Sequence, residues 1–326
     1  MSRLMGLYAQ HLGAEQRSPY ASEADYEAAV ARAAELLGQA DFVVAGIGSG
    51  MSSACGYDHY HPIPEFGPGG TLERFRRAHG FDTLMDGYYH LYATNEERWG
   101  FTAAYVDYVE SAPVGRAYRQ LAALLAEKDH FVLTTNVDGQ VRRAFEPERT
   151  WLFQGDLAFL QCSQPCCDEL WSADAFVRRA LDAMGEDGVS VPSELLPRCP
   201  RCGWLMAPWV RDEAFLEGGF WCAQRRRYEA FVRDALSSGG RVLFLELGVG
   251  GMTPGVIELP FWDMTARNDN AFYLRVNYGK AGEPQQLGTR SHTVSADIAD
   301  VIDSGDRFVY LIRFRMRQTN LSPLSH

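Results

Sequence analysis

The stretch from residue 41 to residue 58, DFVVAGIGSGMSSACGYD, constrains the fold more than any other part of the sequence. Its apolar run at 42–45 is short enough for a buried parallel strand, and it continues directly into Gly46 and Gly48. Ser49, Ser52 and Ser53 follow, where a helix N-terminus would present unpaired backbone N–H groups, and glycines without Cβ atoms let a pyrophosphate approach them. The stretch therefore predicts a phosphate-binding turn. An ordinary strand-to-helix turn stays open, because the spacing is GxGxG rather than GxGxxG.

Length and charge limit the kind of partner. The chain has 326 residues, 46% of them hydrophobic and 22% charged, which is enough for one large core and a smaller module. Its net charge of −11 argues against a nucleic acid or an anionic membrane as partner and favours a protein or a small molecule. Because the sequence has no window of about 18 apolar residues and no apolar leader, we expect a cytoplasmic protein.

The spacing of the apolar residues alternates between strand and helix along the chain. Ser22 is placed to cap a helix over 22–39 and Gly38 to stop it, while Pro113 and Pro254 are expected to begin two later helices. Apolar runs predict strands at 42–45, 130–134, 150–153, 241–247, 271–276 and 307–312, and further helices are expected at 220–236 and 297–302. This alternation predicts an α/β fold with a Rossmann-like, doubly wound parallel sheet.

Two stretches after the glycine turn have a different composition. Residues 57–70 are rich in Tyr, His, Pro and Gly, which predicts a long loop over the ligand. Its His59 and His61 are left without a role, since histidines in such loops are more often solvated or stacked. The aromatic residues of 81–108 recur at helical spacing, which favours the core of a helical layer over the lining of a substrate groove.

Cysteines are concentrated in the middle third of the sequence. Cys162 and Cys166 are separated by three residues, and Cys199 and Cys202 by two. Without a secretion signal, two close pairs of thiols favour one closed, structural, tetrahedral zinc site over disulfides or four unbound thiols. The adjacent Cys167 is the alternative to Cys166, which we favour as the ligand.

Polar residues and glycines follow the ends of the predicted strands. In an open α/β sheet these carboxyl ends are where ligands bind. TTNVDG follows the second strand, QGD the third, LGVGGMTP the fourth and VNYG the fifth. Asn-x-Asp-Gly, at 136–139, is also a good turn, and that interpretation stays open here.

The order of these motifs resembles the sirtuin family of NAD-dependent enzymes. The resemblance covers roughly residues 25–315, from AGIGSGMSSA through TTNVDG, QGD, CPRCG and LGVGGMTP to VNYG. It implies a Rossmann-like NAD-binding lobe formed by 22–158 and 211–315, with a zinc-ribbon lobe at 159–210 inserted between its halves. NAD would bind in the cleft between the two lobes.

The resemblance also implies roles for individual residues. Asn136, Asp138 and Gln154 would be the catalytic residues. The NAD-binding residues would be Gly46, Gly48, Ser53, Asp58, Asn136, Asp138, Gln154, Gly248, Thr253 and Asn277. The zinc ligands would be Cys162, Cys166, Cys199 and Cys202.

Gln154 marks the main departure from the sirtuin pattern, since it stands where the family has its catalytic histidine. An imidazole suits the proton abstraction that deacylation needs, whereas a carboxamide cannot accept that proton and can only hold a ribose hydroxyl. The run after the glycine turn differs too, with Gly56-Tyr57-Asp58 and no arginine. Asp156 is the residue that we expect to substitute in part for the missing base.

These departures resemble the class M sirtuins, microbial proteins associated with macrodomain proteins and lipoylated carrier proteins. The resemblance implies a protein ADP-ribosyltransferase that transfers ADP-ribose from NAD to a protein acceptor, such as a lipoylated carrier, and releases nicotinamide. The alternatives are an NAD-dependent lysine deacylase and a non-catalytic NAD or ADP-ribose binding module. Asn136 and Asp138, which are useful where nicotinamide is expelled, argue against the last.

Overall fold

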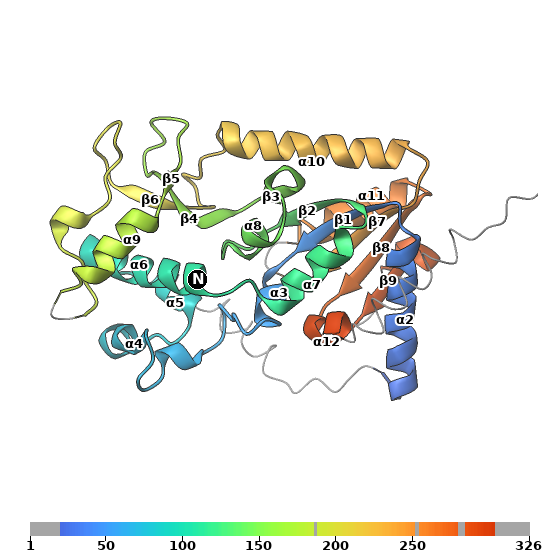
Figure 1. Cartoon of the computed structure of the whole chain (residues 1–326), viewed down its shortest axis with the longest axis horizontal. Helices are drawn as coiled ribbons and strands as arrows, with labels where there is room; N and C mark the ends of the chain where they lie inside the picture. The colour runs from blue at the N-terminus through green and yellow to red at the C-terminus, as the bar shows by residue number, and fades with distance from the viewer. Residues whose placement is uncertain (1–19, 186–187, 252–253, 280–283, 304–326) are drawn as a thin grey trace, which may run out of the picture.

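A parallel sheet forms the centre of the larger lobe. The computed structural model describes residues 20–185, 188–251, 254–279 and 284–303, and the large sheet lies on the right in Figure 1. Its strand order is β3-β2-β1-β7-β8-β9. The strands are β1 (Phe42–Ile47), β2 (Asp129–Thr134), β3 (Thr150–Leu152), β7 (Val242–Leu247), β8 (Ala271–Val276) and β9 (Ser291–Val294). The predicted α/β fold with a doubly wound parallel sheet is therefore confirmed.

The strand order alone indicates where a ligand binds. Numbered along the sheet in chain order, the strands run 3-2-1-4-5-6, so the order reverses between β1 and β7. Ile47 pairs with Thr134 on one side and with Leu247 on the other, and Leu247 pairs with Val276. All four strands thus end at one edge. Ligands of doubly wound sheets bind at this edge, beside the reversal.

Helices cover both faces of the large sheet. Phe42 on β1 meets Phe231 of α10, and Gly46 on the same strand face meets α11, so these two helices share one face (Figure 1). The large-lobe helices are α2 (Glu23–Gln39), α3 (Ser49–Ser53), α7 (Arg116–Leu125), α8 (Gln140–Ala144), α10 (Gly219–Ser237), α11 (Glu258–Arg267) and α12 (Ile298–Asp303).

Helix boundaries confirm part of the predictions and correct the rest. Ser22 caps α2 by accepting a hydrogen bond from the Asp25 N–H, at 3.2 Å. The helix runs through Gly38 and ends at Gln39, so glycine does not stop it. Helix α7 begins at residue 116 rather than at Pro113, because residues 113–115 form no regular structure, and α11 begins at 258 rather than at Pro254, because a turn occupies 254–257.

The smaller lobe has its own sheet and its own apolar core. An antiparallel sheet of order β5-β4-β6 is formed by β4 (Gly155–Cys162), β5 (Trp171–Ser172) and β6 (Met206–Val210). It packs against helices on the left of Figure 1, namely α4 (Glu73–His79), α5 (Leu84–Tyr89), α6 (Asn95–Ser111) and α9 (Asp174–Asp182). Phe81, Trp99, Phe101 and Tyr105 of the aromatic stretch are buried there, which confirms that these residues are core, whereas Tyr89 is exposed.

Three expectations about strands and lobe boundaries are corrected or stay open. Within the described ranges the last strand of the large sheet is β9, whose short sequence SHTV lacks the apolar run that would have predicted it. The strand expected at 307–312 lies outside the described residues. The boundaries at 158 and 211 stay a prediction. None of the helices in the described ranges has the length and apolar character that a membrane crossing requires.

Candidate active site and candidate metal centre

Two glycine turns meet where the strand order reverses. Gly48 caps the amino end of α3 and follows β1, and Gly248 follows β7 with a φ of +61°. The Gly50 N–H donates to the Gly248 carbonyl at 2.9 Å. A Cβ on Gly48 would lie 2.6 Å from the Gly248 oxygen and 2.7 Å from the Cα of Val249. Only glycine fits this close contact, and the two turns therefore form one surface of backbone groups.

The remaining residues expected around the turns have different positions. Gly46 lies inside β1, and a Cβ there would come within 2.3 Å of the Ile257 side chain, so its small size serves packing against α11. Ser53 is half-buried in α3. The Asn277 side chain donates to the Val249 carbonyl at 2.8 Å, which brings it to the second glycine turn. Thr253 lies outside the described residues.

The Asn136 side chain reaches the first glycine turn from the end of β2. Its Nδ2 donates to the Gly48 carbonyl at 2.9 Å, to Tyr118 Oη at 3.0 Å and to Ser52 Oγ at 3.2 Å. The backbone N–H of Asn136 donates to Thr134 Oγ1. The amide is thereby fixed with its nitrogen toward the protein.

Asp138 is a buried carboxylate rather than an open one, with 3% of its surface exposed. Oδ1 accepts from the Gln140 N–H at 3.1 Å, and Oδ2 accepts from Ser52 Oγ and lies 3.4 Å from His59 Nε2. Burial opposes ionisation, but the bonds from His59, Ser52 and the Gln140 N–H prevail and hold the pKa of Asp138 below its usual value. Asp138 therefore serves as an ionised acceptor inside the protein.

The two loop histidines differ. His59 is buried, with 7% exposed, and its Nδ1 lies 2.9 Å from Tyr105 Oη, so the expectation of a solvated or merely stacked side chain is wrong for it. His61 is exposed and its Nδ1 lies 2.8 Å from Asp58 Oδ2. Asp58 also accepts from the backbone N–H groups of Tyr60 and His61, which closes a turn of the loop. Burial raises the pKa of Asp58, but these bonds outweigh it and lower the pKa overall.

Gln154 lies in the tight turn between β3 and β4. The Phe153 N–H donates to the Thr134 carbonyl at 3.0 Å, which ties this turn to the end of β2. Arg211 holds the other side: its backbone N–H donates to the Gln154 carbonyl at 2.9 Å, and its guanidinium to the Phe153 carbonyl. Gly155 has a φ of +87°. Thr134 of β2 pairs with Leu152 of β3. Asn136 and Gln154 each follow their member of this pair by two residues, so they stand side by side at the edge of the sheet.

Asp156 is held inside the protein. Oδ2 accepts from Arg142 Nε at 2.9 Å, Oδ1 accepts from the Ala158 N–H at 2.8 Å, and 1% of the residue is exposed. Burial raises the pKa of Asp156 to about 6 although Arg142 opposes the shift. Arg142 also bonds to Glu110 of α6, so these three charged residues join the two lobes.

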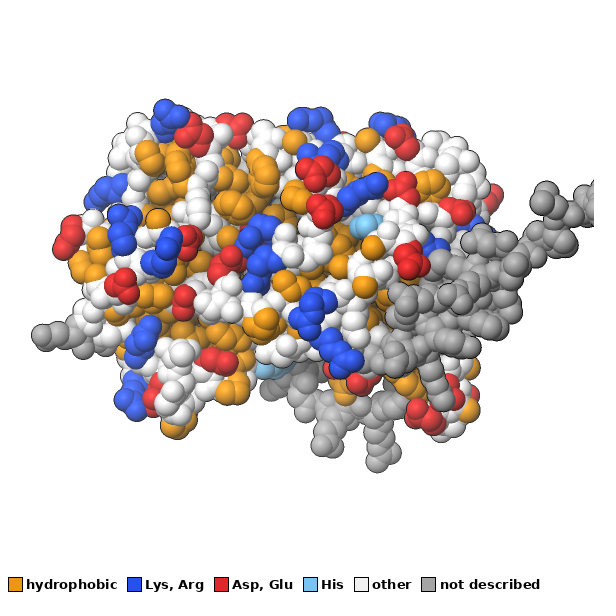
Figure 2. Space-filling view, viewed as in Figure 1, with side chains coloured by type: hydrophobic (Ala, Val, Ile, Leu, Met, Phe, Trp, Pro, Cys, Tyr) orange, Lys and Arg blue, Asp and Glu red, His pale blue; other side chains and the backbone are white. Residues whose placement is uncertain are grey.

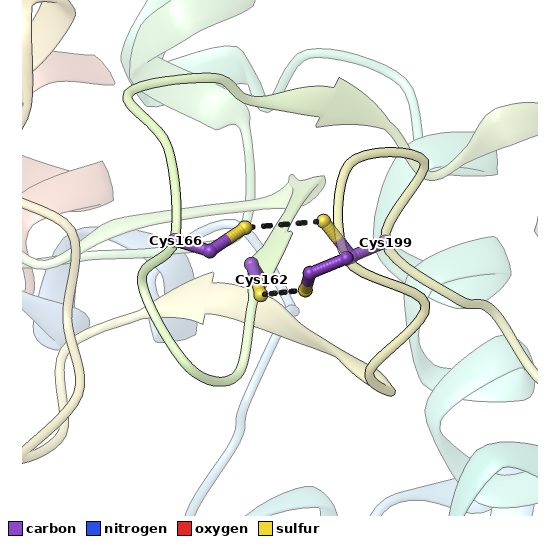
Figure 3. A group of neighbouring side chains, drawn as sticks. Cys162, Cys166 and Cys199 are labelled. Atoms are coloured by element: carbon purple, nitrogen blue, oxygen red, sulfur yellow. Dashed lines mark hydrogen bonds between the residues drawn. The ribbon is translucent and has the colours of Figure 1, made fainter.

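The structure brings together the four cysteines expected to bind zinc. The Sγ atoms of Cys162, Cys166, Cys199 and Cys202 all lie within 4.8 Å of one another (Figure 3). The Sγ distances are 3.5 Å from Cys162 to Cys202 and 3.6 Å from Cys166 to Cys199. Four thiolates about 2.3 Å from a tetrahedral zinc stand about 3.8 Å apart, so the set fits this metal.

Local structure explains how the cysteines converge. Cys162 ends β4, and Cys199 and Cys202 lie in a knuckle where the Gly203 N–H donates to the Cys199 carbonyl at 2.8 Å. Gly203 has a φ of +79°, which the knuckle requires. Cys167 contacts Cys166 at 3.7 Å and is not part of the four-sulfur group. The geometry favours Cys166 as the fourth ligand.

Several residues of the site were not predicted. Ser52, Tyr118 and Tyr105 complete the network around Asp138 and Asn136, and Arg211 holds the Gln154 turn. The serines after the glycine turn were the only sequence sign of Ser52. Tyr118 and Tyr105 look like ordinary core residues of amphipathic helices, since only their hydroxyl groups separate them from phenylalanine.

The chain is similar to known proteins both in sequence and in structure. No family model matches the chain. A protein ADP-ribosyltransferase of Staphylococcus aureus is 30% identical over 282 residues, which cover 83% of this chain and 85% of that protein. A probable bifunctional ADP-ribose hydrolase/ADP-ribosyltransferase of Fusarium oxysporum is 29% identical over 266 residues, or 76% of this chain and 42% of that protein. An NAD-dependent protein deacetylase of Bradyrhizobium diazoefficiens is 28% identical over 173 residues, or 52% of this chain and 63% of that protein.

Solved structures give the same result for the fold. A Sir2 homologue in complex with ADP-ribose has a TM-score of 0.56 at 18% identity, covering 90% of this chain and 99% of that one. A Sir2 protein with a peptide and NAD+ has a TM-score of 0.53 at 19% identity, covering 89% of this chain and 98% of that one. The fold is thus that of Sir2 proteins. Since the Staphylococcus aureus protein is also 30% identical over most of both chains, the chain belongs to the sirtuin family.

Proposed function

We propose that this chain is an NAD-dependent protein ADP-ribosyltransferase of the sirtuin type. The bond between C1′ of the nicotinamide ribose and nicotinamide breaks, and nicotinamide leaves with the electron pair. A side-chain nucleophile of the acceptor protein forms the new bond to C1′. Any proton on that nucleophile passes to solvent. The names of two relatives, one from Staphylococcus aureus and one from Fusarium oxysporum, support this reaction.

The observation that carries the proposal is the position of Gln154. It stands beside Asn136 at the carboxyl edge of the sheet, in a turn fixed by Thr134 and by Arg211. The side chain of Gln154 is half-buried and makes no hydrogen bond within the part of the chain that the structure describes. A carboxamide there can hold a ribose hydroxyl but cannot take its proton, so transfer is favoured over deacylation.

The two glycine turns are where NAD would bind. Its phosphates would lie against the backbone surface that these turns form at the reversal of strand order, and Asn277 lies on the adenosine side of this surface. Asn136 is placed to meet the nicotinamide ribose. The four cysteines would hold a zinc ion that stabilises the small lobe and leaves no open coordination position for chemistry.

Asp156 is a poor substitute for the missing base. Both of its oxygens are bonded to protein groups, and it is buried. A base contributes roughly 10²-fold to 10⁴-fold to such a step, so its absence lowers deacylation without forbidding it. The relative named as a deacetylase keeps deacylation as the second candidate function.

The acceptor is proposed to be a protein, and a lipoylated carrier protein is the first to test. The relative from Fusarium oxysporum combines transferase and ADP-ribose hydrolase in its name, and this chain spans 42% of it. A separate macrodomain protein that removes ADP-ribose would supply the second activity here. We expect the reaction to take place in the cytoplasm.

The decisive experiment compares the wild type with Asn136→Ala and Gln154→Ala. Each protein is incubated with NAD and a carrier protein in lipoylated and unlipoylated form, and acceptor mass, free nicotinamide and deacylation of acetyl-lysine and lipoyl-lysine peptides are measured. We expect the wild type to modify the acceptor and both variants to lose at least about 10²-fold in rate. Efficient deacylation with no modified acceptor would refute the proposal, and NAD binding without free nicotinamide would establish a binding module.

A further inference from the structure

His59 is a buried histidine of the 57–70 loop with a bonded partner on each ring nitrogen. Nε2 lies 3.4 Å from Asp138 Oδ2, and Nδ1 lies 2.9 Å from Tyr105 Oη. The His59 carbonyl also accepts from the Met85 N–H at 3.0 Å, which fixes the backbone of the loop at this point. Tyr105 comes from α6 of the small lobe and Asp138 from the end of β2 in the large lobe. The ring therefore bridges the two lobes.

The hydrogen-bond donors and acceptors assign a tautomer to the ring. The Tyr105 hydroxyl is fully enclosed, and its acceptors among the described residues are His59 Nδ1 and, at 4.0 Å, the sulfur of Met85. Imidazole nitrogen is much the better acceptor, so Tyr105 donates its proton to Nδ1. The ring proton then resides on Nε2 and points at the Asp138 carboxylate. With the protons placed in this way, each ring nitrogen of His59 and the Tyr105 hydroxyl has a hydrogen-bond partner.

The same direction of donation continues from Asp138 to Asn136. Because the carboxylate only accepts, Ser52 must donate its hydroxyl proton to Oδ2. The Ser52 oxygen is then free to accept from Asn136 Nδ2 at 3.2 Å and from Tyr118 Oη at 2.9 Å. Asn136 Nδ2 thus shares its two protons among three acceptors, namely Ser52 Oγ, Tyr118 Oη and the Gly48 carbonyl. These bonds fix the nitrogen toward the protein. The amide oxygen accepts no hydrogen bond within the part of the chain that the structure describes, which leaves it available to a ligand.

We propose that His59 is a positioning residue for the reaction. Locked by Tyr105 in the Nε2–H form, it donates to Asp138, and Asp138 orders Ser52 so that Asn136 presents its amide oxygen to the nicotinamide ribose. The effect on catalysis rests on the proposed function. The tautomer itself does not depend on that function.

The first test therefore needs no turnover. Nitrogen-15 NMR of histidine-labelled protein at pH 7.5, with His59 assigned by comparison with a His59→Gln sample, distinguishes the two tautomers by their nitrogen shifts and couplings. We expect an Nε2–H ring in the wild type and a mixture of tautomers in Tyr105→Phe. An Nδ1–H ring, or a ring averaged as in free histidine, would overturn the proposal whether or not the protein transfers ADP-ribose.

The second test separates positioning from folding through kinetics of nicotinamide release. His59→Ala should lower kcat about 10²-fold, as expected when a catalytic group is misplaced by about 1 Å, while KM for NAD changes less than about threefold. His59→Gln should recover most of kcat, because its amide can still donate to Asp138. His130→Gln is the control, since His130 lies at the opposite end of β2 and its ring bonds only to the Lys128 carbonyl within the described ranges.

Thermal unfolding of the same proteins completes the comparison. Equal loss of kcat in His59→Ala and His59→Gln, or a rise in KM with kcat unchanged, would contradict a positioning role. A wild type that releases no nicotinamide would instead reject the proposed function, and the NMR measurement would still decide the tautomer.

Discussion

The two candidate sites are built in opposite ways. The metal centre takes four side chains of one kind from two short segments, each held by local turns of the small lobe. The network around Asn136 and Asp138 takes different side chains from the glycine turn, the 57–70 loop, α6, α7 and the end of β2. Two of the cysteines are exposed, whereas Ser52 and Asp138 are buried.

This difference separates what stabilises each site. Sulfur atoms at 3.5–3.6 Å gain little from one another, and a metal ion is what would make their arrangement favourable. The Asp138 network needs no added ion, because each buried polar atom already has a protein partner. Removing one partner there leaves a buried group unsatisfied. The stability of the cysteine site should therefore depend on bound metal. The stability of the Asp138 network should depend on how the two lobes pack.

The largest effect is expected from removing two metal ligands together. Cys199→Ser with Cys202→Ser should abolish zinc binding and unfold the knuckle, because structural zinc contributes about 10 kcal/mol or more of binding free energy in small zinc domains. Metal analysis and thermal unfolding measure both effects. Cys167→Ser is the matched control and should keep one zinc per chain, since its sulfur lies outside the four-sulfur group. Full zinc content in the double variant would show that these cysteines are not the ligands.

A smaller but still large effect is expected where the glycine turns meet. Gly48→Val places a branched side chain against the backbone of Gly248 and Val249, which cannot move aside as a flexible side chain can. We expect a loss of at least about 3 kcal/mol in stability, the upper end for overpacking, and at least about 10²-fold weaker NAD binding by calorimetry. Gly38→Ala is the control, since nothing lies within 4 Å of its Cβ position and helix α2 should gain stability. Unchanged NAD affinity in Gly48→Val would show that the NAD phosphates do not bind at this turn.

A third, smaller effect concerns the charged residues that join the two lobes. The pKa of Asp156 in the folded protein, about 6, is above its ordinary value of 3.8, so the folded state binds this proton more tightly than the unfolded state. The free energy of unfolding should therefore fall as pH rises from about 4 to about 6, by at most about 3 kcal/mol, and Asp156→Asn should lose this step.

Thermal unfolding at intervals between pH 4 and pH 8 checks the effect. Asp129→Asn is the matched control, because Asp129 is exposed and pairs with Arg149 at the surface, where ion pairs contribute little. Identical pH dependence in the wild type and Asp156→Asn would show that the ordinary pKa of Asp156 is kept in the fold.

Much of the fold was open to prediction from local patterns. Short apolar runs ending in glycine or Asn-x-Asp identified β1, β2, β7 and β8, because a strand buried on both faces must be continuously apolar. The strand β9 was missed because its sequence SHTV has no apolar run, and the antiparallel strands β4 and β6 were missed because their pairing joins segments about 50 residues apart. Figure 2 shows acidic and basic side chains interspersed over one face of the molecule. Charges mixed in this way leave no pattern in the sequence that would point to a site on this face.

For the sites, the sequence alone determined the residues whose chemistry is rare and whose spacing is short. Paired cysteines and glycines after a strand have few other uses, so their positions predicted a metal centre and a phosphate-binding turn. Only the tertiary structure decided that His59 is buried against Tyr105, that Ser52 lies between Asp138 and Asn136, and that Gly46 serves packing. The hydrogen bonds among these residues join positions 46 to 86 apart, and no local pattern encodes which polar side chain will be enclosed when two lobes close on each other.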